Sequence, residues 1–531
     1  MNREKIIKYV KALKTNKNIL ATLKASPRRT IWRGRAFRFN LHNFRLNDGL
    51  SIRRFSVVEA SVLLMLALLT SRVLGVIRQI TFNAMFNPAS AAVNAYIASA
   101  RFPDILYNLV AGGALIHAFI PVFLSYEKQH GEYEAWQLAS LAFNVLFVVL
   151  TLIVLVSELL APVFVTNILV PGFSKTNPAA IPITITMTRI MLMQPLILGL
   201  GTIASAVLNS KRQFLLPALA LAVYNVGMLV GLLVAKVVPG VGIYGPVYGT
   251  LVAVGLQVLV QIPGLLKQGM RYTFTWNLGH PGLRQILILL LPNALSLSIA
   301  SFGNVVDTQF SSQIRDTVSL SALQNAEMLQ ALPVALIGQA IGQALLPHLS
   351  MQATSGQYMR MRQTAFKVMG MSMLFTIPAL LALIALGPPL IHILFRHGAF
   401  TQHAADMTYL ALIGYCLAIP GMAIVPLVTA GFYAFKDAVT RFLSNTYGFL
   451  AHWGFLALFF HYLQGPNIIL AVPLANAIAS TTEAALVGLV LLIRLQKRLK
   501  GDKVMLRLQR RRLHAQIAQL RGSSAPVLSD R

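Results

Sequence analysis

Long apolar segments recur along most of this 531-residue chain, and they restrict its fold more than any other feature. A bilayer core about 30 Å thick is crossed by a helix of roughly 20 apolar residues. Segments of at least that length occupy about 57–86, 91–123, 135–161, 178–208, 214–237, 241–266, 285–314, 320–349, 364–387, 404–433, 440–462 and 467–495. Hydrophobic residues make up 56% of the chain and charged residues 11%, a balance that leaves a soluble protein without enough polar surface. We therefore predict an all-α polytopic membrane protein with about 12 transmembrane helices.

The net charge of +29 is concentrated at the two ends of the chain, since 15 of the 45 Lys and Arg residues precede Phe55 and 11 follow Ile493. The loops between the predicted helices alternate between the two sides of the membrane. One side holds Lys128, Lys211, Arg212, Lys267, Arg271, Arg284, Arg360, Arg362, Lys367, Lys436 and Arg441, and the other holds Lys175, Lys236, Arg315 and Arg396. Cytoplasmic loops are enriched in Lys and Arg, so this asymmetry predicts that both termini are cytoplasmic.

Two internal echoes, each repeating after about 225 residues, indicate two related halves. GALIHAFIPVFLSYEKQHGEYEAW near 113–136 is similar to GQALLPHLSMQATSGQYMRMRQ near 342–363, and VLNSKRQFLLPALALAVYN at 207–225 is similar to GFYAFKDAVTRFLSNTYGF at 431–449. Six spans per half give both halves the same orientation, as in transporters with parallel repeats, and favour a substrate cavity between two lobes. We predict a basic arm at 1–55, lobes at 56–270 and 271–496, and a basic tail at 497–531.

The basic arm and tail have two interpretations. Apolar residues recur near helical spacing among the lysines of the arm, which favours a helix on the anionic inner leaflet. Alternatively, both ends are solvated and only set the orientation of the chain. Nucleic-acid binding is not expected, because no recognition fold or aromatic interleaving accompanies the charge.

Ionisable residues inside a predicted span are functional candidates, because an intramembrane charge costs several kcal/mol unless it faces a wet cavity or a partner. LLTSRVLGVIRQITF places Arg72 and Arg78 six residues apart, about 9 Å along a helix and about 120° apart around it. Two guanidinium groups suit a phosphate or pyrophosphate, because their planar donors bind such oxygens in pairs. In the alternative interpretation, Arg78 reaches the outer interface and Arg72 pairs with a carbonyl or an acid.

Five further intramembrane charges have both a functional and a structural interpretation. Arg101 and Asp104 lie three residues apart, a spacing that also allows a mutually neutralising pair on one helix face. Asp307, Glu327 and Arg189 stand alone in their spans, where each could line the cavity, bind a coupling cation or pair with another helix.

Sequence patterns of enzymes are missing from the chain. It has no nucleotide-binding glycine loop, no HExxH motif and a single cysteine, Cys416. We therefore expect a transporter without metal or cofactor, driven by an ion gradient, the membrane potential or the gradient of its substrate.

Five blocks carry a resemblance to a known family. They are TSRVLGVIRQ, ARFPDILYNLVAGGALIHAFIPVF, VLNSKRQFLLPALALAVYN, LFRHGAFTQHAAD and GFYAFKDAVTRF, and they span about 55–495 in consistent order. This pattern resembles the MurJ (MviN) family of lipid II flippases, within the multidrug/oligosaccharidyl-lipid/polysaccharide exporter superfamily.

The resemblance implies a protein of the bacterial cytoplasmic membrane that moves undecaprenyl-linked peptidoglycan precursor to the outer leaflet by alternating access, in contact with cell-wall synthesis proteins. Arg72, Arg78 and Arg101 match basic positions of the family's cationic cavity, to which Asp104 and Glu327 are added here as cavity candidates. Asp307 and Arg189 are assigned to coupling or pairing.

Several charges typical of the family are absent from this chain. The positions concerned hold Gln79, Asn94, Tyr107, Asn108, Gly112 and Met328. The reduced charge keeps two alternatives open: export of another polyprenyl-linked glycan or amphipathic molecule, and a non-transporting scaffold of the cell envelope.

Overall fold

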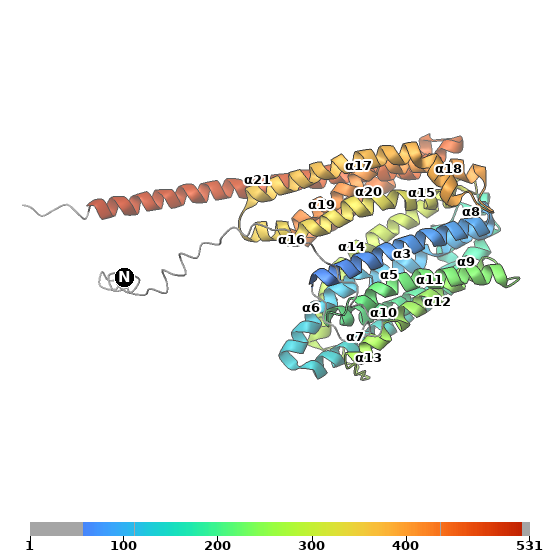
Figure 1. The fold of residues 1–531 in the computed structure, drawn as a ribbon, viewed down its shortest axis with the longest axis horizontal. Coiled ribbons are helices and arrows are strands. Elements are labelled where there is room, and N and C mark those ends of the chain that lie inside the picture. Colours follow the sequence, from blue (N-terminus) through green and yellow to red (C-terminus); the bar gives the residue numbers. More distant parts are fainter. Residues whose placement is uncertain (1–56, 111, 436, 523–531) are drawn as a thin grey trace, which may run out of the picture. The chain divides into compact units, whose positions relative to one another are not determined.

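The computed structural model describes residues 57–110, 112–435 and 437–522, and every regular element within these ranges is helical (Figure 1). The first half contains α3 (Val57–Met85), α4 (Ala91–Ser99), α5 (Arg101–Val110), α6 (Gly113–His130), α7 (Glu132–Phe164), η2 (Val165–Leu169), α8 (Phe173–Thr176), α9 (Ala180–Met191), α10 (Met193–Ser210), α11 (Leu215–Val237), α12 (Tyr244–Leu259) and α13 (Ile262–Lys267). The second half contains α14 (Pro281–Ser311), α15 (Ser319–Pro333), η3 (Val334–Gln339), α16 (Ala340–Thr354), α17 (Tyr358–Phe395), α18 (Gln402–Cys416), α19 (Ile419–Ala434), α20 (Ala438–Tyr462), η4 (Gly465–Leu470) and α21 (Ala471–Gly522).

Each of the predicted spans coincides with one or more of these helices, which confirms the all-α class. Within the described ranges, nine helical segments are long and apolar enough to cross a membrane, or ten if the bent pair α18 and α19 is one span. This count is lower than the predicted twelve, and α3 and α20 are the two predicted spans outside it. The low hydropathy of α20 follows from its polar residues, which include Arg441 and His452.

Prolines mark several breaks in the helices, because proline removes a backbone donor and clashes with the preceding turn. Pro333 ends α15 and is followed by the π-helical turn η3, and Pro162 lies three residues before the π-helical turn η2. A bend of 43° separates α18 from α19, which has Pro420 in its first turn. Pro292 and Pro378, in contrast, lie inside the continuous helices α14 and α17.

The first sequence echo corresponds to the same local structure in both halves. Gly131 joins α6 to α7 with φ 94°, and Gly356 lies between α16 and α17 with φ 68°. Glycine suits these positions because a side chain disfavours the left-handed backbone that ends a helix. The second echo also forms a helix–turn–helix in each half, from α10 to α11 and from α19 to α20.

The turns of the second echo both carry ion pairs. After α10, Lys211 lies 2.5 Å from Glu127 and 2.8 Å from Glu132. Burial alone lowers the pKa of Lys211, but the hydrogen bonds and charges of the two glutamates outweigh it and raise the pKa above its ordinary value. After α19, Asp437 caps α20 and pairs with Arg494 of α21. Both turns are thus fixed to neighbouring helices by charge.

The helices α3 to α21 belong to one compact unit, in which α14 contacts both halves. On one side α14 packs against α5 and α6, and on the other against α20. Elsewhere α11 packs on α3 and α12, α15 on α18, α16 on α19, and α21 on α17, α19 and α20 (Figure 1). The lobe boundary between residues 270 and 271 and the cytoplasmic termini stay predictions, and the arm at 1–55 lies outside the described residues. The predicted tail boundary at 497 falls inside α21, which is helical to Gly522.

A buried amide network joins the two halves at α3 and α15. Asn325 Oδ1 accepts hydrogen bonds of 3.0 Å from both Gln79 Nε2 and Asn83 Nδ2. All three side chains are buried. Because an unpaired amide in an apolar interior is costly, this network favours one register of α3 against α15.

Candidate functional site

A cavity of about 150 Å³ in the first half brings together three of the predicted site residues, Arg78 from α3 and Arg101 and Asp104 from α5. The remaining wall comes from α4, α9, α10, α11 and α12, and from α15 of the second half. Its other polar side chains are Gln79, Tyr96, Gln194, Tyr224, Thr250 and Gln324. The cavity is therefore lined by hydrogen-bonding groups around two guanidiniums and one carboxyl.

The charged side chains of this cavity line the same space, but they form no ion pair with one another in the described structure. Within the described structure, no ion pair joins Arg101 to Asp104, although Asp104 lies within the electrostatic reach of Arg101. The Arg101 Nε is buried and has no hydrogen-bond partner in this part of the chain. The charge of Arg78 acts on the hydroxyls of Tyr96 and Tyr224. Donors thus remain for an anion with several oxygens, and the mutually neutralising pair is not formed.

Glu327 and Asp307 lie next to this cavity without lining it. Glu327, on α15, interacts electrostatically with both Arg101 and Asp307. Asp307, on α14, forms a hydrogen bond of 2.6 Å with His452 Nε2 of α20. Of the three interpretations left open for Asp307, which were lining the cavity, binding a coupling cation and pairing with another helix, interhelical pairing is present in this structure.

Arg72 and Arg189 lie elsewhere. Arg72 is exposed on α3 and lines neither this cavity nor the second polar cavity, which lies in the other half of the chain. Arg189 Nε lies 3.8 Å from Glu158 Oε2 with 49% of its side chain exposed, so it is one partner of a surface ion pair.

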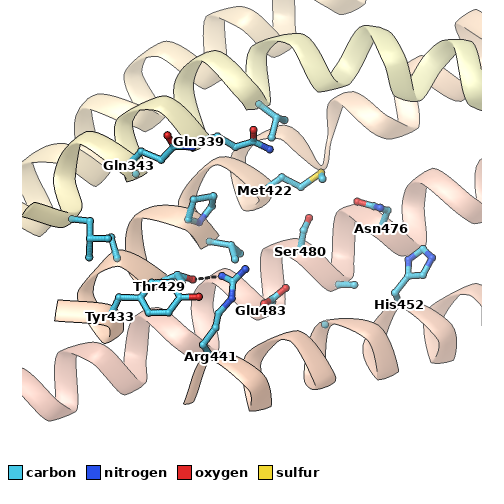
Figure 2. Close-up of a pocket in the computed structure, with 18 residues that line it drawn as sticks. Gln339, Gln343, Met422, Thr429, Tyr433, Arg441, His452, Asn476, Ser480 and Glu483 are labelled. Carbon is cyan, nitrogen blue, oxygen red and sulfur yellow. Dashed lines mark hydrogen bonds between the residues drawn. The ribbon is translucent and has the colours of Figure 1, made fainter. Parts of the chain in front are cut away.

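A second and larger polar cavity, of about 630 Å³, lies in the second half between η3, α16, α19, α20 and α21 (Figure 2). Its polar side chains are Gln339, Gln343, Thr429, Tyr433, Arg441, His452, Asn476, Ser480 and Glu483. Figure 2 shows Arg441 and Glu483 beside one another, with Gln339 and Gln343 on the opposite wall and His452 near Asn476. The volume is in the range of small-molecule sites.

Local contacts hold the charged groups of the second cavity in place. Arg441 Nη1 donates a hydrogen bond of 2.6 Å to Thr429 Oγ1, and Ser444 Oγ donates one of 2.5 Å to Glu483 Oε1. Gly448 leaves room for this carboxylate, because a Cβ there would lie 2.5 Å from Glu483 Oε2.

Sequence analysis missed this second cavity. The sequence placed Arg441 only among the loop cations, although it lies in the first turn of α20 and lines the cavity. Glu483 satisfies the rule that selected the other candidates, since it is an acid within the span predicted at 467–495. His452 escaped that rule because imidazole carries no fixed charge.

Long apolar helices with kinks, and polar cavities between them, are typical of a multi-pass membrane transporter. A family profile described as lipid II flippase MurJ matches residues 83–518. The chain therefore belongs to the lipid II flippase MurJ family, and it is a multi-pass protein of the bacterial cytoplasmic membrane.

Individual relatives agree with this assignment. The lipid II flippase MurJ of Burkholderia cenocepacia is 31% identical over 379 residues, which cover 70% of this chain and 72% of the relative. The probable lipid II flippase MurJ of Bdellovibrio bacteriovorus is 28% identical over 453 residues, covering 85% and 84%. A solved MurJ in an inward closed conformation has a TM-score of 0.67 at 22% identity, covering 83% of this chain and 93% of that chain. An inward-facing multidrug transporter of the MATE family has a TM-score of 0.69 at 14% identity, covering 81% and 96%. These last two likenesses concern the fold alone.

Proposed function

We propose that this protein moves lipid II, a lipid-linked peptidoglycan precursor, from the inner to the outer leaflet by alternating access. The main support is the first cavity, where Arg78 and the unpartnered Arg101 face a space enclosed by six further helices. Guanidiniums held in a poorly solvated site bind the oxygens of a pyrophosphate in pairs and hold its charge inside the membrane. Asp104 limits the net charge, so that the anion can also leave.

Alternating access requires two halves that change their contacts around a cavity. The sequence echoes and their shared local structure support a parallel repeat, with both termini in the cytoplasm. In this proposal α14, which packs on α5, α6 and α20, is the helix along which the halves change their contacts. Arg72 lies outside the cavity in this conformation, and Arg189 stabilises the contact of α9 with α7 instead of binding substrate.

One observation favours a different cargo as the second candidate. The positions that align with the family's arginine pair hold Tyr107 and Asn108. Tyr107 forms a hydrogen bond of 3.2 Å with Thr202, and Asn108 donates one of 2.9 Å to Ser301. These side chains connect helices and add no positive charge, which suits a polyprenyl-linked glycan with less negative charge than lipid II.

Complementation of a bacterium depleted of its own flippase tests the first proposal. The wild-type chain is expected to restore growth, and Arg78→Ala and Arg101→Ala are each expected to weaken substrate binding about 10- to 150-fold, because a hydrogen bond to a charged group contributes about 1.5–3 kcal/mol. The matched control is Arg189→Ala, which removes a guanidinium that pairs with Glu158 outside the cavity. Cells with this variant are expected to grow like cells with the wild-type protein.

Membrane insertion of each variant is measured by immunoblot. If correctly inserted wild-type protein does not restore growth, the proposal that lipid II is the substrate loses its support and the second candidate is favoured. Wild-type growth of both cavity variants would show that the cationic cavity does not bind the substrate.

A further inference from the structure

A hydrogen-bonded carboxyl–imidazole pair connects α14 to α20 inside the membrane helices. His452 Nε2 and Asp307 Oδ1 are 2.6 Å apart, and the two side chains are 9% and 23% exposed. His452 also lines the second cavity, whose 630 Å³ give the pair a route to water. Buried ionisable groups of this kind mark ion or proton pathways in membrane proteins.

The ionisable groups around this pair come from four other helices. Glu327 of α15 lies within the electrostatic reach of Asp307, and so does the hydroxyl of Tyr415 on α18. Arg101 of α5, the cation of the first cavity, interacts electrostatically with Glu327. Arg441 and Glu483, from α20 and α21, line the second cavity together with His452. The pair is thus connected by charge to both polar cavities.

The donor set favours a proton over a metal ion. Hard cations take six or more oxygen ligands, whereas a histidine nitrogen occupies one face of the Asp307 carboxyl here. In the described part of the chain, no group of three His, Cys, Asp or Glu side chains is placed to hold a metal ion. A carboxyl and an imidazole in one short hydrogen bond need only a proton.

We propose that Asp307 and His452 form a proton-binding site that is coupled electrostatically to the anion subsite at Arg101. In its neutral form the pair holds one proton in the Nε2–Oδ1 hydrogen bond. Release of one proton to water in the second cavity leaves a carboxylate and a neutral imidazole whose remaining N–H donates from Nε2, a change of one negative charge. This negative charge and an anion bound at Arg101 repel each other across the low-dielectric interior, because α14, which carries Asp307, packs on α5, which carries Arg101. Anion binding and proton binding therefore favour each other, and the effect is reciprocal.

This inference rests on the proposed anion subsite, and a binding assay on purified full-length protein tests the two separately. The probe is a uridine diphosphate sugar, a soluble pyrophosphate diester whose phosphates stay ionised between about pH 5 and pH 8, the range in which histidine titrates. The dissociation constant is measured by calorimetry at several pH values. Wild type is expected to bind more tightly as the pH falls, by at most about 10-fold per unit, the limit that linkage to one proton sets.

His452→Gln and Asp307→Asn are expected to remove this pH dependence while retaining binding. The matched control is His461→Gln, which removes an exposed imidazole of the same helix that packs on Tyr462 and is expected to keep the wild-type slope. A slope that persists in both pair variants would overturn the proton site. Binding that depends on sodium at constant pH, and loses that dependence in Asp307→Asn, would assign the site to a metal cation and overturn it as well.

A second measurement covers variants that fold poorly and a subsite that fails to bind the probe. The imidazole of His452 in the wild-type protein is titrated by nitrogen NMR without any ligand. A titration that shifts in Arg101→Gln supports the linked site, whereas a His452 signal that is unaffected by this change overturns it. Absence of probe binding at every pH, with the NMR linkage intact, would refute the anion subsite alone.

Discussion

Replacement of Lys211 by Met is expected to destabilise the first half by about 3 kcal/mol, a value that follows from the surroundings of the ammonium group. The Lys211 side chain is 13% exposed and its closest partner, Glu127, is 29% exposed, so this hydrogen bond between charged groups contributes about 1.5–3 kcal/mol. Glu132 is 61% exposed, and its contact contributes at most about 1 kcal/mol. The rings of Phe123 and Trp136 lie 6.0 and 5.9 Å from the ammonium and add about 0.5–1 kcal/mol. Methionine keeps the aliphatic packing and removes only the charge.

The assay is thermal unfolding in detergent, followed by tryptophan fluorescence. The expected loss corresponds to a fall in Tm of about 3 to 6 °C for a protein of this size. Adding Glu127→Gln to Lys211→Met should restore part of the loss, because the stranded carboxylate becomes neutral. Lys128→Met is the matched control, since it removes an exposed lysine next to Glu127 and should change Tm by less than about 1 °C.

The pH dependence of this difference provides a further check. The pKa of Lys211 is raised above its ordinary value of 10.5 by its two glutamate partners, which outweigh the effect of burial. A raised lysine pKa adds stability that is complete below that ordinary value and is lost as the pH rises through the raised one. The gap between wild type and Lys211→Met should therefore be constant near neutrality and close only above about pH 10.5. A gap below about 0.5 kcal/mol at pH 7, or one equal to that of Lys128→Met, would refute the assignment.

Two further predictions concern the second half and the packing of α11. Asp437→Ala should lower the free energy of unfolding by about 2 kcal/mol and Asp437→Asn by about 1 kcal/mol, because asparagine keeps the cap of α20 to Thr440 and loses the pair with Arg494. Burial raises the Asp437 pKa, but hydrogen bonding to Thr440 and Arg494 outweighs it and lowers the pKa from 3.8 to about 2. The stability that the carboxylate contributes is therefore complete above pH 3.8 and is lost as the pH falls through about 2. Measurement of Tm against pH in wild type and Asp437→Asn checks this. Gly231→Ala should cost about 1–3 kcal/mol in the same thermal assay, since its Cβ would lie 2.5 Å from the Gly249 Cα, and an unchanged Tm would show that α11 and α12 are free to separate.

Much of the fold was predictable because the bilayer imposes length and hydropathy on each span. The segment boundaries agree with the helices, since backbone groups in lipid must be satisfied within a helix. The effect of proline differs from helix to helix. Pro333 is followed by a π-helical turn, but Pro292 lies in a continuous helix, because neighbouring contacts determine whether the helix yields at the lost hydrogen bond.

The candidate site was only partly predictable, because the rotation of each helix decides where its charges point. Arg72 and Arg78 lie on one helix about 120° apart, and the sequence alone does not tell which of them faces inward. In the structure, Asn225 Nδ2 of α11 donates a hydrogen bond of 3.0 Å to Ser71 Oγ of α3, and in this rotation of α3 Arg78 lines the first cavity and Arg72 is exposed. That contact links residues about 150 positions apart, so local periodicity could not reveal it.

The position of α14 explains how a charge change at one residue could affect both halves. This helix packs on α5, which carries Arg101, and on α20, which carries His452, while its own Asp307 bonds to the latter. A change in the charge of Asp307 alters its hydrogen bond to His452 and also the field at Glu327. Because low-dielectric surroundings strengthen such interactions, we expect the protonation of this pair to affect the contacts of α14 with both α20 and α5. The amide network of Asn325 has no net charge and is unaffected by pH, so it can keep α3 and α15 joined while α14 moves.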